Sequence, residues 1–438
     1  MSNATEDLHR RLTQLSESLL AHLSTTPYAP PEGSAVSVKF VLQSLLHNPS
    51  SGAGESQLQE SIRNFVLASA LLSASESSTH ELLSWIPRQL AAAAAASFRD
   101  LSDVYCHGND KRLVAELAPE VLLLLKDRIK ESSIDKGTDG DEVSAASARV
   151  PVGIAILAAY QLRWFVTQID KLNLGKLCNL VIPCALTALD HWSTEVKGQG
   201  MICFIHLGKN VNSAEFGVYQ DVILDACCNN IASADEIWHL VVEMSVLLVS
   251  SIHQSNPRSH WYERILGEML SHLERQPRNK ERRVAWLTFI EPLFQSMGLV
   301  LLAHFRRLFP LFFKWIHADD DETVLLVLKR VHTVLKLTWI RNTPYIMRLV
   351  DELVALHKEA ALRVGREEIR TSILEVLLLL KQCKRQQFTA AWEMHRDDSN
   401  LAALCLSLTE ISIDEESSTS NTLRSDSPQN CLQLLTTH

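Results

Sequence analysis

Apolar and polar residues follow one another along this chain with the spacing of amphipathic helices. One representative stretch has apolar residues at i, i+1, i+4, i+5 and i+8, which places them on one helical face. These residues are Val181, Ile182, Ala185, Leu186 and Leu189. The polar residues 190–194 interrupt the pattern, and a second apolar face follows at Val196, Gly200, Cys203, Phe204 and Leu207. The stretch predicts a helical hairpin, in which Gly200 lets the two helices approach closely.

The same layout recurs downstream. Residues 308–337 predict a second hairpin, whose turn "HADDDE" places carboxylates at a helix N-terminus, where the helix dipole favours them. Weaker copies cover 219–249, 264–294 and 347–380. The positions taken as equivalent are Pro183, Leu224, Leu266, Pro310 and Val350, at steps of 41, 42, 44 and 40 residues. This period predicts an all-α protein, an α-solenoid of HEAT/armadillo-like helical repeats. An irregular helical bundle without true repeats is the alternative.

The chain divides into four regions by its pattern. Helices are predicted over 5–25, 36–46, 57–74, 78–98 and 113–130, which together make an N-terminal helical region at 1–130. Residues 131–149 are polar and rich in Gly and Ser, which predicts a flexible insertion. We expect the repeat array at 150–408 and a disordered, acidic, Ser-rich tail at 409–438.

Composition narrows the class of protein. The 438 residues include only 15 Gly and 14 Pro, which disfavours a turn-rich β protein. A net charge of −9 argues against a dedicated nucleic-acid binder. The nine Cys form no Cys-x-x-Cys pair and sit mostly on apolar faces, so we expect reduced, buried thiols in a cytosolic or nuclear protein. The polar N-terminus and the lack of a long uncharged apolar run predict no signal peptide and no membrane span.

Motifs of catalysis are missing from the sequence. There is no phosphate-binding G-x-x-x-x-G-K-[ST] loop, no G-x-S-x-G and no H-E-x-x-H, and the stretch "HLGKN" (206–210) lacks the residues that such a loop needs. The 17 His do not cluster with Cys at zinc spacing. We therefore expect no enzyme activity, no cofactor and no metal.

Basic residues gather in the C-terminal half and predict contacts with an acidic partner. The candidates are Arg282, Arg283, Arg306, Arg307, Lys329, Arg330 and Arg341. A merely solvated face is the alternative. Trp192 stands in a turn between helices and is a candidate anchor for a partner, although it would equally suit packing on the adjacent repeat. Trp339 is expected in the core.

The segment 181–211 resembles the family of the second Tel-two-interacting protein. The matching residues are Leu189, Asp190, Val196, Lys197, Gly200 and Ile205-His206-Leu207. Residues 305–341 also resemble the later repeats of that family, including the pair Thr338-Trp339, and the resemblance covers about 150–360. The resemblance transfers no individual binding residue.

This resemblance implies a function. The family belongs to the Triple-T complex, which works with the ninety-kilodalton heat-shock chaperone machinery to mature phosphatidylinositol-3-kinase-related kinases. It implies a non-catalytic co-chaperone scaffold, with Tel-two-like and Tti-one-like helical-repeat proteins as partners and related kinases as clients. The alternative is a general armadillo adaptor for transport or ubiquitin-ligase docking, which would need a ladder of Asn and Trp that this chain lacks.

Overall fold

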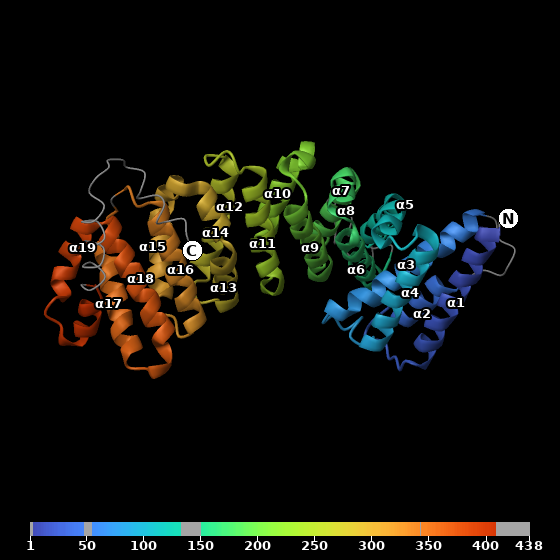
Figure 1. Cartoon of the computed structure of the whole chain (residues 1–438), viewed down its shortest axis with the longest axis horizontal. Helices are drawn as coiled ribbons and strands as arrows, with labels where there is room; N and C mark the ends of the chain where they lie inside the picture. Colours follow the sequence, from blue (N-terminus) through green and yellow to red (C-terminus); the bar gives the residue numbers. More distant parts are fainter. Residues whose placement is uncertain (1–2, 48–54, 133–149, 342, 409–438) are drawn as a thin grey trace, which may run out of the picture. The chain divides into compact units, whose positions relative to one another are not determined.

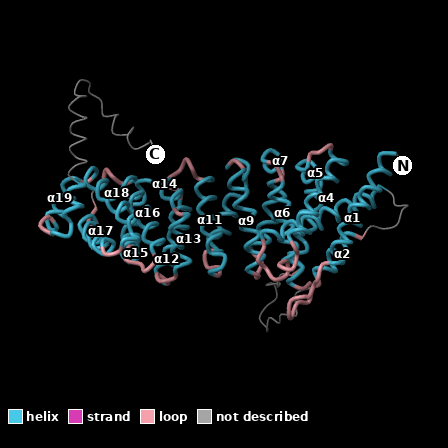
Figure 2. Tube along the Cα trace, turned by 60° about the horizontal axis from the view of Figure 1, so that its bottom comes forward, coloured by secondary structure: helices cyan, strands magenta, loops and turns pink. Residues whose placement is uncertain are grey.

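The computed structural model describes residues 3–47, 55–132, 150–341 and 343–408. Within these ranges every regular element is a helix, and short turns join the helices (Figures 1 and 2). The all-α prediction is therefore confirmed. The chain forms two compact units, Met1–His272 and Leu273–His438, and the boundary between them in the sequence falls within helix α12 (His260–Arg275).

The N-terminal unit stacks its helices in two layers. Its helices before α12 are α1 (Asn3–Thr25), α2 (Val38–Leu46), α3 (Glu55–Ala74), α4 (Arg88–Cys106), α5 (Asp110–Glu131), α6 (Val152–Gln168), α7 (Lys171–Lys176), α8 (Cys178–Leu189), α9 (Thr194–Asn210), α10 (Gln220–Asn230) and α11 (Asp235–Ile252). Helices α3, α6, α9 and α11 pack one on the next, while α5 packs on α8 and α8 on α10. The pairs α5/α6, α8/α9 and α10/α11 connect the two layers.

The C-terminal unit continues the same arrangement. Its helices after α12 are α13 (Lys280–Phe289), α14 (Glu291–Met297), α15 (Phe305–Trp315), α16 (Asp321–Leu337), α17 (Ile346–Ala361), α18 (Glu367–Cys383) and α19 (Arg385–Trp392). Helix α16 packs against α13, α15 and α18, and α17 packs against α18 and α19 (Figure 1). An aromatic cluster fills the core near α13, where Trp286 contacts Phe294, Phe312 and Trp315.

The predicted repeat register is confirmed at the level of helices. The five equivalent positions fall in α8, α10, α12, α15 and α17, and a second helix follows each of them. The register does not identify a single buried face, because Pro310 is exposed whereas Leu224, Leu266 and Val350 are buried. A proline is tolerated in these helices at different rotational positions, so it marks the helix rather than its inner side.

Gly200 has the role that the sequence predicts. A Cβ atom built there would lie 2.9 Å from the Cβ of Ala188 and 3.1 Å from the carbonyl oxygen of Ala185. Both contacts come from α8, so the missing side chain lets α9 lie directly on that helix. Ser193 is the N-cap residue of α9, although its side chain makes no cap hydrogen bond.

The predicted helix at 78–98 is wrong in its bounds. Residues 80–86 form turns that bury Leu82, Leu83 and Ile86, and α4 begins only after Pro87. Proline disfavours helical geometry in the residue before it but suits the start of a helix, which explains the shift. The weak repeat at 264–294 is likewise divided, because Pro292 stands in the first turn of a separate helix, α14.

The structure bears on two further expectations, that the cysteines are buried thiols and that no segment spans a membrane. Six cysteines lie buried as free thiols, namely Cys106, Cys178, Cys184, Cys203, Cys227 and Cys228. The stretch Glu291–Trp315 has the length and apolarity of a membrane span, but half of its apolar window is buried. The stretch also breaks at Gly298, whose φ is +50°, and its aromatic residues pack in the core. Residues 133–149 and 409–438, and hence nearly all of the predicted insertion and the whole tail, lie outside the described residues.

Candidate functional site

Three of the predicted partner-binding arginines form ion pairs between helices of the C-terminal unit. Arg283 on α13 pairs with Asp320, and its Nε donates to Thr323 Oγ1 at 3.0 Å. Arg307 on α15 makes a two-pronged pair with Glu274, at 2.8 and 2.7 Å. The buried Arg330 on α16 lies 2.5 Å from Glu291. These side chains join successive repeats, and their charges are matched within the unit.

The other predicted cations differ in exposure. Arg282 is buried, and its backbone N–H donates to the cap residue Asn279. Arg306, Lys329 and Arg341 are exposed. Lys329 and Arg330 line a hollow of about 270 Å³ that also includes Glu291. The structure thus separates the predicted set into buried or paired residues and three exposed ones. Partner contact by any of them stays a prediction.

Trp192 has features of both alternatives predicted from the sequence, because its side chain packs on neighbouring residues and is also exposed. Its Nε1 donates to the carbonyl oxygen of Ser132 at 3.2 Å, and its ring stacks on His191. Even so, 54% of the residue is exposed. Burial lowers the pKa of His191. The N–H of Ser193 donates to His191 Nδ1, which leaves the protonated Nε2 of the neutral ring to donate to Ser132 Oγ. Trp192 is therefore a fixed and half-exposed aromatic side chain.

Sequence reasoning missed three exposed apolar residues in and just after the turn between α16 and α17. Trp339, expected in the core, is 45% exposed, and the neighbouring Ile340 is 58% exposed. Met347, in the first turn of α17, is 49% exposed. We call these three residues the 339 patch. The buried apolar face of α16 ends at Leu335, the helix ends at Leu337, and Trp339 and Ile340 follow in the turn with exposed side chains.

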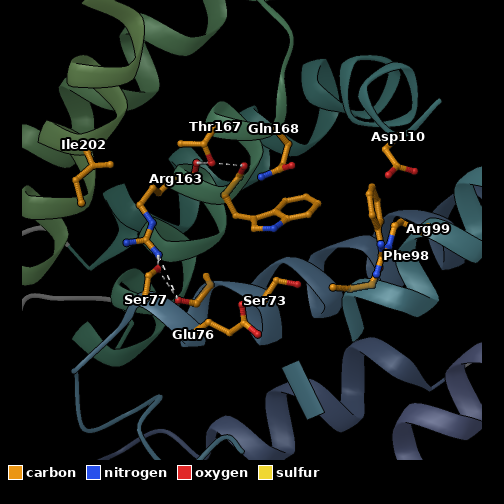
Figure 3. A pocket seen from close by; sticks show the side chains of 13 residues that line it. Ser73, Glu76, Ser77, Phe98, Arg99, Asp110, Arg163, Thr167, Gln168 and Ile202 are labelled. Carbon is orange, nitrogen blue, oxygen red and sulfur yellow. Dashed lines mark hydrogen bonds between the residues drawn. The ribbon is translucent and has the colours of Figure 1, made fainter. Parts of the chain in front are cut away.

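A hollow of about 600 Å³ in the N-terminal unit lies beside α3, α4, α6 and α9. Figure 3 shows Arg163 extending toward Ser77, to which it donates at 2.7 Å. Burial lowers the pKa of Arg163. Trp164 lines the hollow and packs edge-to-face on Phe98. Glu76 and Arg99 are exposed at this hollow, so both signs of charge are present. In the part of the chain that the structure describes, no group of three or more His, Cys, Asp or Glu is arranged to hold a metal ion.

Comparison with known proteins assigns the chain to a family. It is 58% identical over 417 residues to the Arabidopsis thaliana protein At2g39910, and the match covers 92% of this chain and 95% of that protein. The chain belongs to the family of At2g39910. This family is distantly related to TELO2-interacting protein 2, because the chain is 22% identical to the Homo sapiens protein over 244 residues. That match covers 51% of this chain and 47% of the human protein, about half of each.

The solved structures establish the type of repeat. A crystal structure of importin beta superposes with a TM-score of 0.53 at 12% identity, covering 90% of this chain and 47% of importin beta. No protein-family model matches the chain. The α-solenoid prediction is confirmed, and so is the resemblance to TELO2-interacting protein 2. The fold and the homology are those of a helical-repeat scaffold.

Proposed function

We propose that this chain is a non-catalytic subunit of a Triple-T-like co-chaperone assembly that helps to mature and stabilise phosphatidylinositol-3-kinase-related kinases. The observation that carries the proposal is the homology to TELO2-interacting protein 2, a protein named for its contact with TELO2. By this relation, the chain's partners are Tel-two-like and Tti-one-like helical-repeat proteins together with the heat-shock chaperone machinery. The proposal implies that the protein works in the cytosol or the nucleus.

The fold supports a binding role. Stacked helix pairs bury one face against their neighbours and leave long outer surfaces, which helical-repeat proteins use to hold other macromolecules. The inter-helix ion pairs at Arg283, Arg307 and Arg330 join successive repeats of the C-terminal unit. Such cross-links hold the surface in a defined form, and a preformed surface loses less entropy when it binds a partner.

A tagged pull-down of the full chain from its native source, at low salt and analysed by mass spectrometry, tests the proposal. We expect recovery of Tel-two-like and Tti-one-like proteins together with a large related kinase. Depletion of the chain should then lower the level of that kinase without lowering its transcript. Recovery of transport cargo or ubiquitin machinery instead would favour a general armadillo adaptor and reject the co-chaperone proposal.

A further inference from the structure

The 339 patch exposes its apolar side chains from a turn that is held rigidly. Lys384, which is 5% exposed, donates from Nζ to the carbonyl oxygen of Trp339 at 2.6 Å and also to that of Arg341. Gln387 donates to the carbonyl oxygen of Thr343 at 3.4 Å. A single ammonium group from the end of α18 therefore binds the two carbonyl groups that flank the residue pair Ile340-Arg341.

Burial of the Lys384 ammonium group costs free energy, and the packing of the turn alone does not explain why that cost is met. Removing an ammonium group from water is unfavourable unless it finds good hydrogen-bond acceptors. Here the acceptors are main-chain carbonyls of a turn whose largest side chains, Trp339 and Ile340, point away from the core. A rigid, exposed aromatic side chain on a fixed backbone is the usual form of a binding hot spot, since little freedom remains to be lost on binding.

The charge around the patch selects the chemistry of a partner. Residues 323–350 contain no Asp or Glu, and their basic residues are Lys329, Arg330, Lys336, Arg341 and Arg348, of which Arg330 pairs with Glu291 and Arg348 with Glu352. Residues 296–317 also contain no acidic residue and include Arg306. Among the described residues, no ion pair holds Arg306 or Arg341. Phe309 of α15 stacks on Tyr345 with ring centroids 4.7 Å apart, which places α15 against the start of α17.

We propose that the 339 patch docks an acidic amphipathic helix of a helical-repeat partner. The apolar stripe of that helix covers Trp339, Ile340 and Met347, and its bordering carboxylates face Arg341 and Arg306. A helix is the occupant because the partners of the proposed function, on which this inference rests, offer helices as their surface elements. Such a helix matches the patch in apolar surface and in charge, so that apolar contact holds the helix and the opposite charges steer its approach.

The first test uses a fluorescein-labelled synthetic peptide, an amphipathic helix with a Leu stripe bordered by Glu, and a matched peptide with Lys in place of Glu. Fluorescence anisotropy against the full chain should show binding of the Glu peptide alone. The double variant W339A/I340A should weaken binding at least about tenfold, as truncation of a hot spot does. The variant R341E should reverse the preference toward the Lys peptide. Equal binding of both peptides to every variant would overturn the proposal.

The control variant is L362S. Leu362 is a large exposed apolar residue in the turn after α17, in the same unit but outside the patch. Its substitution should leave peptide binding unchanged, whereas a loss equal to that of W339A/I340A would show non-specific apolar attachment and reject the patch. A synthetic peptide of residues 409–438 serves as competitor. Displacement of the Glu peptide by this competitor at equal concentration would assign the patch to the chain's own tail, against the proposal.

The same variants separate this inference from the proposed function. In the native-source pull-down, W339A/I340A should lose the helical-repeat partner while L362S retains it. If wild-type chain and W339A/I340A recover that partner equally, the patch is not its docking site and the co-chaperone proposal still stands. If the wild-type chain recovers no such partner, the co-chaperone proposal fails, and the peptide measurements alone decide whether the patch binds acidic helices.

Discussion

Asp320 and Asp321 are adjacent in the chain, yet their carboxylates bind arginines from helices on either side of α16. Asp320 pairs with Arg283 of α13, and Asp321 Oδ1 lies 2.7 Å from Arg366, the residue before α18. Helices α13, α16 and α18 pack in that order. The start of α16 therefore joins the second helices of three successive repeats. The helix dipole also favours two carboxylates at this N-terminus.

Replacement of Asp320 should destabilise the C-terminal unit. Burial raises the pKa of Asp320, but hydrogen bonds from the side chain and backbone of Thr323 and from Arg283, with the charge of Arg283, together lower it to about 2. Because the folded-state pKa lies below the unfolded value, the carboxylate stabilises the fold above about pH 4. This contribution, about 2 kcal/mol, is lost as the pH falls from about 4 to about 2. Urea unfolding of D320A, measured from pH 7 down to pH 2, should show a lower free energy of unfolding than the wild type at pH 7 and a weaker dependence of that free energy on pH between 4 and 2.

The matched control for Asp320 is D319N. Asp319 is exposed and lies one residue earlier in the same turn. D319N should unfold like the wild type at every pH. D320N keeps an acceptor for the N–H of Thr323 and should recover about half of the loss, because asparagine is also a good N-cap. Identical unfolding of D320A and wild-type protein at pH 7 would show that the Arg283 pair contributes nothing.

Gly200→Ala should destabilise the N-terminal unit by about 1–3 kcal/mol, since the added methyl group meets Ala188 and the backbone of α8 and forces the helices apart. Calorimetric melting of the full chain measures this effect. Gly365→Ala is the control, because a Cβ there meets nothing within 4 Å and the backbone needs no positive φ. A melting temperature of Gly200→Ala equal to that of the control would contradict close packing of α8 and α9.

The apolar period was sufficient to predict the fold and the helices of the repeats. Most of the residues that predicted the helices in 181–380 face the core, and burial imposes that spacing directly, whereas Pro310 is exposed. The start of α4 was not predicted, because the buried Leu82, Leu83 and Ile86 pack from turns and imitate a helical face. Spacing alone cannot distinguish a buried turn from a buried helix.

The candidate site was less predictable for a different reason. Arg283, Arg307 and Arg330 are basic in the sequence, but their carboxylate partners Asp320, Glu274 and Glu291 are from 33 to 39 residues away and come together only on folding. Trp339 was misplaced because an apolar residue at the end of an apolar helix has the same pattern whether it faces in or out. It lies in a turn whose main chain is held by the Lys384 ammonium group, 45 positions away in the sequence.

The buried cysteines should resist thiol reagents in the native protein. Burial raises the pKa of Cys203 and Cys227 to about 12 and that of Cys184 to about 11. Reactivity requires the thiolate and access to it, and both are withheld here. Alkylation with a mass-labelled reagent at pH 8, followed by peptide mapping, should leave these three sites unmodified until urea is added. Rapid labelling of Cys203 in the native chain would contradict its position in the core.

Lys384→Met should loosen the turn that carries the 339 patch without removing any residue of the patch. The carbonyl groups of Trp339 and Arg341 would lose their shared donor, and a hydrogen bond to a charged group contributes about 1.5–3 kcal/mol. Hydrogen–deuterium exchange of the turn should accelerate, and binding of the Glu peptide should weaken although Trp339 is intact. Lys314→Met, at an exposed lysine of α15, should change neither quantity. Unchanged exchange in Lys384→Met would mean that the ammonium group does not hold the turn, and Lys384 would then not be what fixes the backbone of the 339 patch.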